Sequence, residues 1–78
     1  MNWHSSAFIG EVTAVGYRGI YTTRPHGSHC VLCGVGHDGL PMLALPPFGR
    51  AFTYPAEARE YAEKLDAFVH AEAYCSGG

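Results

Sequence analysis

Three histidines, two cysteines and an aspartate gather within residues 26–39, the part of the chain richest in groups that could do chemistry. Cys30 and Cys33 have the Cys-x-x-Cys spacing of a zinc half-site, and histidine is the other ligand that zinc prefers. One hypothesis is therefore a small zinc-binding module. Its ligands would be His29, Cys30, Cys33 and His37.

The residues between the two cysteines argue against that site. Val31 and Leu32 favour a strand, where residues three apart point to opposite faces, so Cys30 and Cys33 would not meet at one ion. Catalysis has even less support in the sequence, because a triad is defined by geometry and no phosphate loop or nucleophile elbow is present. We therefore expect no enzymatic activity, no metal and no cofactor.

The elements that would position these groups are mainly strands. Residues 8–17 and 20–23 favour extended structure, and Gly16-Tyr17-Arg18-Gly19 between them predicts a tight turn or a bulge. Either two short strands or one bulged strand fits this pattern. Residues 29–35 predict the next strand, residues 36–39 a hairpin turn at Asp-Gly, and residues 40–45 its partner at a sheet edge, since Pro41 lacks an N–H.

A C-terminal helix is predicted from Pro55 to about Ala73. Its apolar stripe comprises Ala58, Tyr61, Ala62, Leu65, Phe68 and Val69. The remaining positions are expected to face solvent: Glu57, Arg59, Glu60, Glu63, Lys64, Asp66 and His70. Together the elements predict one α+β domain over residues 1–78, with an antiparallel sheet of three or four strands, one helix packed on one face, and frayed ends at residues 1–6 and 75–78.

Composition excludes several functions. Five Lys and Arg against seven Asp and Glu give no basic stripe, so we expect no direct binding to nucleic acid. The apolar fraction of 47% and the charged fraction of 15% exclude a disordered chain. No signal peptide or membrane-spanning segment is found, so we expect a cytoplasmic protein whose three cysteines are thiols.

One helix covers only one face of a small sheet, and here both faces are apolar. Residues 29–35 place His29, Val31, Cys33 and Val35 on one side and Cys30, Leu32 and Gly34 on the other. An uncovered apolar face marks an interaction surface. Two alternatives remain open: Trp3 and the corner at residues 46–52 fold over that face, or a second copy covers it in a homodimer.

Tyrosine and arginine are enriched at the centres of protein interfaces. The candidate partner-binding residues are Tyr17, Arg18, Tyr21, Arg24 and Arg50. In size, lack of a catalytic motif and surplus apolar face, the chain resembles the small inhibitors encoded by phages and other mobile elements, among them the anti-CRISPR proteins. The resemblance is one of overall type. It implies a protein that docks on a host protein or nucleoprotein complex, a CRISPR-Cas effector, and blocks recruitment or cleavage of target DNA.

Overall fold

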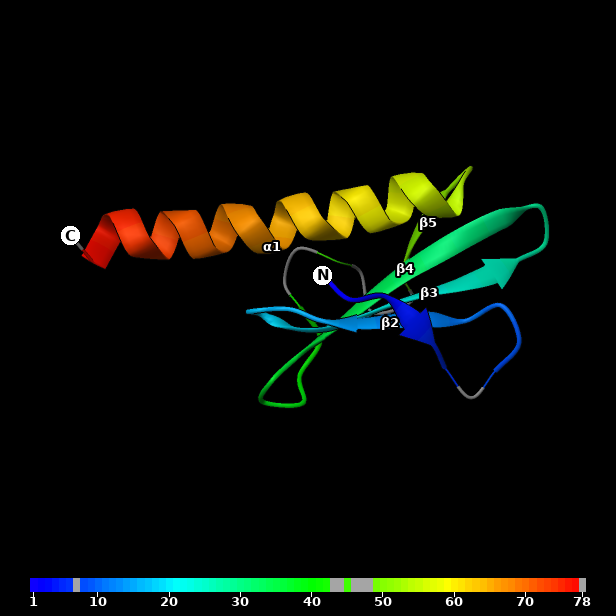
Figure 1. Ribbon diagram of the computed structural model, residues 1–78, viewed down its shortest axis with the longest axis horizontal. Helices are drawn as coiled ribbons and strands as arrows, with labels where there is room; N and C mark the ends of the chain where they lie inside the picture. Colours follow the sequence, from blue (N-terminus) through cyan, green and yellow to red (C-terminus); the bar gives the residue numbers. More distant parts are fainter. Residues whose placement is uncertain (7, 43–44, 46–48, 78) are drawn as a thin grey trace.

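The computed structural model describes residues 1–6, 8–42, 45 and 49–77, with helix side chains described up to residue 67 (Figure 1). These residues form a five-stranded antiparallel sheet in the order β1-β2-β3-β4-β5, with one C-terminal helix packed against it. The predicted α+β fold is confirmed, with more strands than the three or four expected. The elements are β1 (His4–Ser5), β2 (Val12–Val15), β3 (Gly19–His26), β4 (His29–Gly36), β5 (Arg50–Phe52) and α1 (Pro55–Gly77).

The two short edge strands account for the higher count. His4 and Ser5, expected in a frayed start, pair with Thr13 and Val12. At the other edge, β5 pairs with residues 30–32 of β4. Strands of two or three residues are too short to produce an alternating pattern in the sequence, which is why periodicity missed β1.

The question of one bulged strand or two short strands is settled by the turn at residues 16–19. The Gly16 amide donates to the Gly19 carbonyl at 2.8 Å, and Val15 then pairs directly with Ile20. Strands β2 and β3 are therefore a tight hairpin. The predicted strand over residues 8–17 starts later than expected, because the Glu11 amide donates to the Phe8 carbonyl at 3.1 Å in a preceding turn.

The predicted partner strand over residues 40–45 is wrong for the residues described there. Only Pro41 pairs with β4, through an isolated bridge to Val35. Met42 and Leu45 are buried instead, and a Cβ added at Gly34 would lie 2.7 Å from the Met42 sulfur and 2.8 Å from Leu45 Cδ1. The missing side chain at Gly34 thus leaves room that these two residues fill. Residues 43, 44 and 46–48 of this predicted strand and corner lie outside the described residues.

The core lies between the helix and one sheet face. Its buried members are Tyr21, Cys30, Leu32, Met42, Leu45, Ala58 and Ala62, with Trp3, Phe52, Tyr61 and Leu65 packed against them. The helix begins at Pro55 as predicted, ends at Gly77 rather than near Ala73, and extends past the sheet (Figure 1). The side chains of Phe68 and Val69 lie outside the described part of the chain. No helix in the described segments is long and apolar enough to cross a membrane.

Candidate functional site: an open sheet face, its anchored turn and a cavity

Register assigns every strand residue to one of two sheet faces. Residues paired across antiparallel strands share a face, and alternate residues along a strand change face. Ala14, Tyr21 and Leu32 are fully buried and define the inner face, which the helix covers. The residues between them form the outer face, so the alternation expected for residues 29–35 is confirmed.

A continuous apolar row crosses the outer face near the β2–β3 turn. Val15 pairs with Ile20, Ile20 with Val35, and Val35 with Pro41. We call Val15, Ile20, Val35 and Pro41 the open row. The first three are 58%, 43% and 44% exposed, and Pro41 is exposed as well. Four neighbouring apolar side chains thus face solvent together.

The outer face becomes more polar with distance from the open row. The next set of paired residues is Thr13, Thr22 and Cys33, with the two threonine hydroxyls 3.4 Å apart. Beyond it, Arg24 lies opposite Val31 and places its guanidinium 3.8 Å from Glu11. Val31 at that end is partly buried, so among the described strand residues the exposed large apolar side chains of this face lie at the end of the open row.

Trp3 does not cover the open row. Its indole packs against the core on the helix side, and Nε1 donates to the Glu63 carboxylate at 2.8 Å. Phe52 also packs against the core, with its ring centroid 5.4 Å from that of Tyr61. Both side chains thus serve the inner face.

The corner at residues 46–52 reaches the outer face at Gly49, which is buried and where an added Cβ would meet Val31 Cγ1 and lie 2.9 Å from Cys33 Sγ. The corner therefore covers part of β4 and leaves the open row exposed, and residues 46–48 lie outside the described residues.

The predicted contact residues do not form one surface. Tyr17 is 71% exposed and Arg18 half-buried, both on the turn next to the open row. Arg24 lies at the opposite end of the outer face. Arg50 lies on the inner face, since it pairs with the buried Leu32. Its guanidinium lies 4.6 Å from the centre of the Tyr61 ring and donates to that hydroxyl at 3.1 Å.

Tyr21 is a correction, because its side chain is fully buried and unavailable to a partner. Its hydroxyl donates to the Asp66 carboxylate at 3.0 Å. Tyr21 alternates with the exposed Ile20 along β3, and sequence alone did not assign these neighbours to faces. A tyrosine with a buried ring and a paired hydroxyl is the ordinary core arrangement.

Asp66 is the residue that sequence reasoning missed. It was expected on the solvent side of the helix but is 4% exposed. Its carboxylate accepts hydrogen bonds from the Tyr17 amide at 3.0 Å and the Arg18 amide at 2.9 Å, as well as from Tyr21. These bonds hold the β2–β3 turn against the helix. A Cβ at Gly16 would lie 2.6 Å from the Asp66 carboxylate, so Gly16 provides the space for this contact.

The two partners shift each other's ionisation. Burial acts to raise the pKa of Asp66, but the hydrogen bonds from the Arg18 and Tyr17 amides and the Tyr21 hydroxyl outweigh it, and the pKa is lowered. Burial and the hydrogen bond to Asp66 raise the pKa of Tyr21. The pair is thus a carboxylate and a neutral phenol over a wide pH range.

A second turn supports the same end of the sheet. His37, in the turn after β4, has its amide donating to the Arg18 carbonyl at 3.3 Å, and its Nε2 lies 3.1 Å from the Gly16 carbonyl oxygen. The predicted turn at residues 36–39 forms, with the Gly39 amide donating to Gly36 at 2.9 Å. His37 therefore holds one hairpin against another.

The four proposed zinc ligands are not brought together. Cys30 is buried on the inner face, while Cys33 lies on the outer face, as strand geometry requires. His29 begins β4 and His37 follows its end. Among the described residues no group of three or more His, Cys, Asp or Glu side chains could hold a metal ion. Cys30 and Cys33 are free thiols, and the side chain of Cys75 lies outside the described part.

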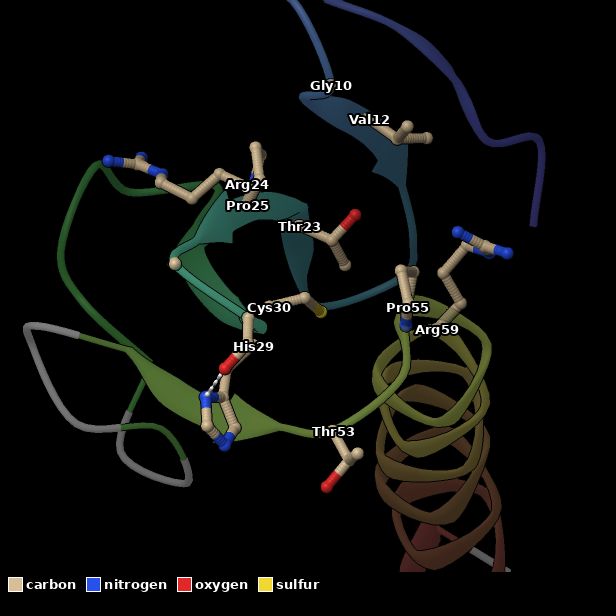
Figure 2. A pocket seen from close by; sticks show the side chains of 12 residues that line it. Gly10, Val12, Thr23, Arg24, Pro25, His29, Cys30, Thr53, Pro55 and Arg59 are labelled. Atoms are coloured by element: carbon tan, nitrogen blue, oxygen red, sulfur yellow. Dashed lines mark hydrogen bonds between the residues drawn. The ribbon is translucent and has the colours of Figure 1, made fainter.

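A cavity of about 360 Å³ opens on the helix side, between the β3–β4 hairpin and the first turn of α1 (Figure 2). Thr23, Cys30, Pro55 and Arg59 are among its lining residues. The cavity is remote from the open row, which lies on the other face and at the other end of the hairpin.

Known protein families, curated proteins and solved structures give no match to this chain. Two features of the molecule bear on function: the open row with its anchored turn, and the cavity at the start of the helix.

Proposed function

We propose that this protein is a small non-enzymatic inhibitor that works by binding another protein through the open row. The observation that carries the proposal is the exposure of Val15, Ile20 and Val35 as direct cross-strand neighbours. Contiguous apolar surface is uncommon on a soluble monomer and marks contact sites. Pro41 extends the same row at its end.

The residues around the row suit a protein contact. Tyr17 and Arg18 flank it on the adjacent turn, and tyrosine and arginine are the residue types enriched at interface hot spots. Leu40, which is 63% exposed, follows the other turn at this end. An apolar centre with an aromatic and charged rim is the common anatomy of an interface.

This surface is also held rigid before binding. The Asp66 carboxylate accepts from the Tyr17 and Arg18 amides, and the Gly16 and Gly19 backbones close the turn. A turn that is already ordered loses less conformational entropy when a partner docks. The hydrogen bonds that stabilise the fold thus also favour binding.

For the target we propose a host protein or nucleoprotein complex, specifically a CRISPR-Cas effector whose recruitment or cleavage of DNA is blocked. The support is the overall resemblance to anti-CRISPR proteins together with the open row. The balance of five basic against seven acidic residues favours contact with protein rather than with nucleic acid. A cytoplasmic location follows as part of the same proposal.

The test uses purified effector complexes of several types, with target cleavage and binding of this protein measured side by side. The matched variants are Ile20→Glu, in the open row, and Ile9→Glu, on the fully exposed turn after β1. We expect the native chain to inhibit at least one effector and Ile20→Glu to weaken binding about 100-fold, as loss of a hot spot does. Ile9→Glu should bind within about 3-fold of the native chain, since surface changes elsewhere cost little.

Circular dichroism confirms that both variants are folded before binding is compared. If Ile20→Glu and Ile9→Glu inhibit equally well, the partner does not bind through the open row. Failure to bind any effector would refute the proposed target class. Sedimentation at micromolar concentration adds a separate outcome: a stable dimer dissociated by Ile20→Glu would show that a second copy covers the row.

A further inference from the structure

The cavity at the start of α1 has features that the proposed protein contact does not use. It lies on the inner face, lined by the end of the β3–β4 hairpin and by the first two helical turns (Figure 2). Val12, Pro25 and Pro55 give it apolar walls. Its volume, about 360 Å³, is in the range of pockets that hold small molecules.

Thr23 places in this cavity a hydroxyl that has no hydrogen-bond partner among the described residues. The residue is 3% exposed, and its neighbours in the sheet, Val12 and Leu32, carry no polar side-chain atoms. Every fully sealed side-chain N or O atom in the described residues has a hydrogen-bond partner among them, whereas the Thr23 hydroxyl has none there. That hydroxyl therefore reaches the cavity, which Val12 and Arg59 also line, and Figure 2 shows it pointing toward Val12.

Arg59 supplies a positive charge that forms no ion pair within 4 Å in the described part of the chain, although it also contributes to the lowered pKa of Glu63, four residues later on the helix. The ion pairs there join the Met1 amine to Glu63, Arg24 to Glu11 and Lys64 to Glu60. Arg59 is half-buried, and its side chain extends from the helix along the cavity (Figure 2). A partly buried guanidinium is stabilised by an anionic oxygen that accepts its hydrogen bonds.

Cys30 adds to the polar lining, which also includes Arg24, Ser28, His29 and Thr53, without adding a competing anion. Burial raises the pKa of its thiol, and the nearby Arg59 charge only partly opposes that effect. The thiol is consequently protonated at neutral pH and acts as a weak hydrogen-bond donor. The cavity thus offers donors from Arg59, Thr23 and Cys30 beside apolar walls.

From this arrangement we infer that the cavity binds a small molecule carrying an oxyanion, either a carboxylate or a phosphate, on a short apolar body. The oxyanion accepts from the Arg59 guanidinium and the Thr23 hydroxyl. The apolar body contacts Val12, Pro25 and Pro55. This site is independent of the open row and does not require the proposed inhibitor function.

The experiment is a titration followed by amide and arginine side-chain NMR on the full chain, with sodium butyrate in one arm and inorganic phosphate in the other. We expect saturable shifts at Thr23, Cys30 and Arg59 in at least one arm. Saturation by butyrate identifies a carboxylate ligand, and saturation by phosphate alone identifies a phosphate ligand.

Four variants separate the cavity from general charge effects. Arg59→Gln should weaken binding at least 10-fold and Thr23→Val several-fold, while Arg59→Lys should keep part of the affinity because it keeps the charge. Lys64→Gln removes a helix charge outside the cavity and should have no effect. Thr23→Val is nearly isosteric and suits a strand, so it stays informative if changes at Arg59 disturb folding.

Shifts that fail to saturate in both arms would overturn the inference. So would affinities that Arg59→Gln and Lys64→Gln lower equally. Ile20→Glu in the open row should leave the titration unchanged, so failure of the protein-contact proposal and failure of this site are distinguishable.

Discussion

The two faces of the sheet are made from the same strands and similar residues, yet only one is a core. On β4, Leu32 is fully buried on the inner face, while Val35, three residues later on the outer face, is 44% exposed. Hydrophobicity does not separate the two. What separates them is the helix, whose Ala58 and Ala62 lie against the inner face.

The comparison shows how a short chain obtains a buried core and an exposed apolar row together. The inner face gains Met42, Leu45 and Trp3 in addition to the helix. The outer face keeps its open row next to the turn that Asp66 anchors. Stability and the proposed binding are thus assigned to opposite sides of one sheet, and mutations can test them separately.

The largest expected difference between the faces is between Leu32→Ala and Val35→Ala. Truncating a fully buried leucine removes apolar contacts and leaves a cavity, which costs about 2–5 kcal/mol. Truncating Val35, already half in water, should cost less than about 1 kcal/mol. Urea unfolding of both variants measures the contrast. Equal losses would mean that the outer face is also packed against something and is not open.

The next effect concerns Asp66, which joins the helix to the turn beside the open row. Asp66→Ala leaves the Tyr17 and Arg18 amides and the Tyr21 hydroxyl without their acceptor, and one unsatisfied buried donor costs about 1–3 kcal/mol. We expect a destabilisation of about 3 kcal/mol. The control is Asp38→Ala, which removes one exposed contact to the Leu40 amide and should cost under about 1 kcal/mol.

Thermal unfolding of both variants compares the stability lost at Asp66 with that lost at Asp38. A loss no greater for Asp66→Ala than for Asp38→Ala would show that the helix is held by apolar packing alone. Because the turn also carries Tyr17 and Arg18, Asp66→Ala should weaken partner binding as well.

The smallest effect is a pH dependence from the same hydrogen bonds. Because folding lowers the pKa of Asp66, its contribution to stability is complete above the unfolded pKa and is lost as pH falls through the folded pKa. Because folding raises the pKa of Tyr21, its contribution is complete below about pH 10, the unfolded pKa, and is lost as pH rises through the folded pKa.

Urea midpoints measured from pH 2 to pH 11 should therefore fall at both extremes. Asp66→Asn should flatten the acid limb and Tyr21→Phe the alkaline limb. The reference for the acid limb is Glu63→Gln, because the hydrogen bond from Trp3 lowers the pKa of Glu63 on the exposed side of the helix. If Glu63→Gln flattens the acid limb and Asp66→Asn leaves it unchanged, the loss of stability at low pH comes from the contacts of Glu63 with Trp3 and the N-terminus, and not from Asp66.

Much of the fold follows from local pattern. Alternation placed Cys30 and Leu32 opposite Val31 and Cys33, proline and the apolar stripe placed the start of the helix, and paired glycines placed the β2–β3 turn. The strand expected at residues 40–45 was wrong because apolar residues of this kind fit a strand and a buried loop equally well. The space at Gly34, which has no side chain, is filled by Met42 and Leu45.

For the candidate site, sequence predicted the type of surface but not all of its residues. Sequence indicated a surplus apolar face and proposed Tyr17 and Arg18 as contact residues, which stays a prediction, but it also placed the buried Tyr21 on the surface. Asp66 gave no signal, because a carboxylate among charged helix residues looks solvated whether or not amides from another element meet it. The cavity is lined by Thr23 and Arg59, which are 36 positions apart by residue number and come to one cavity only through packing.

The sequence by itself determined which residues alternate, where the chain turns and where the helix begins, because these depend on backbone preferences and on contacts within a few residues. Only the tertiary structure decided which sheet face the helix covers, which carboxylate is buried and which apolar row stays in water. Those outcomes arise from long-range packing, where Gly16 and Gly34 leave space that Asp66, Met42 and Leu45 fill, and no local pattern encodes that fit.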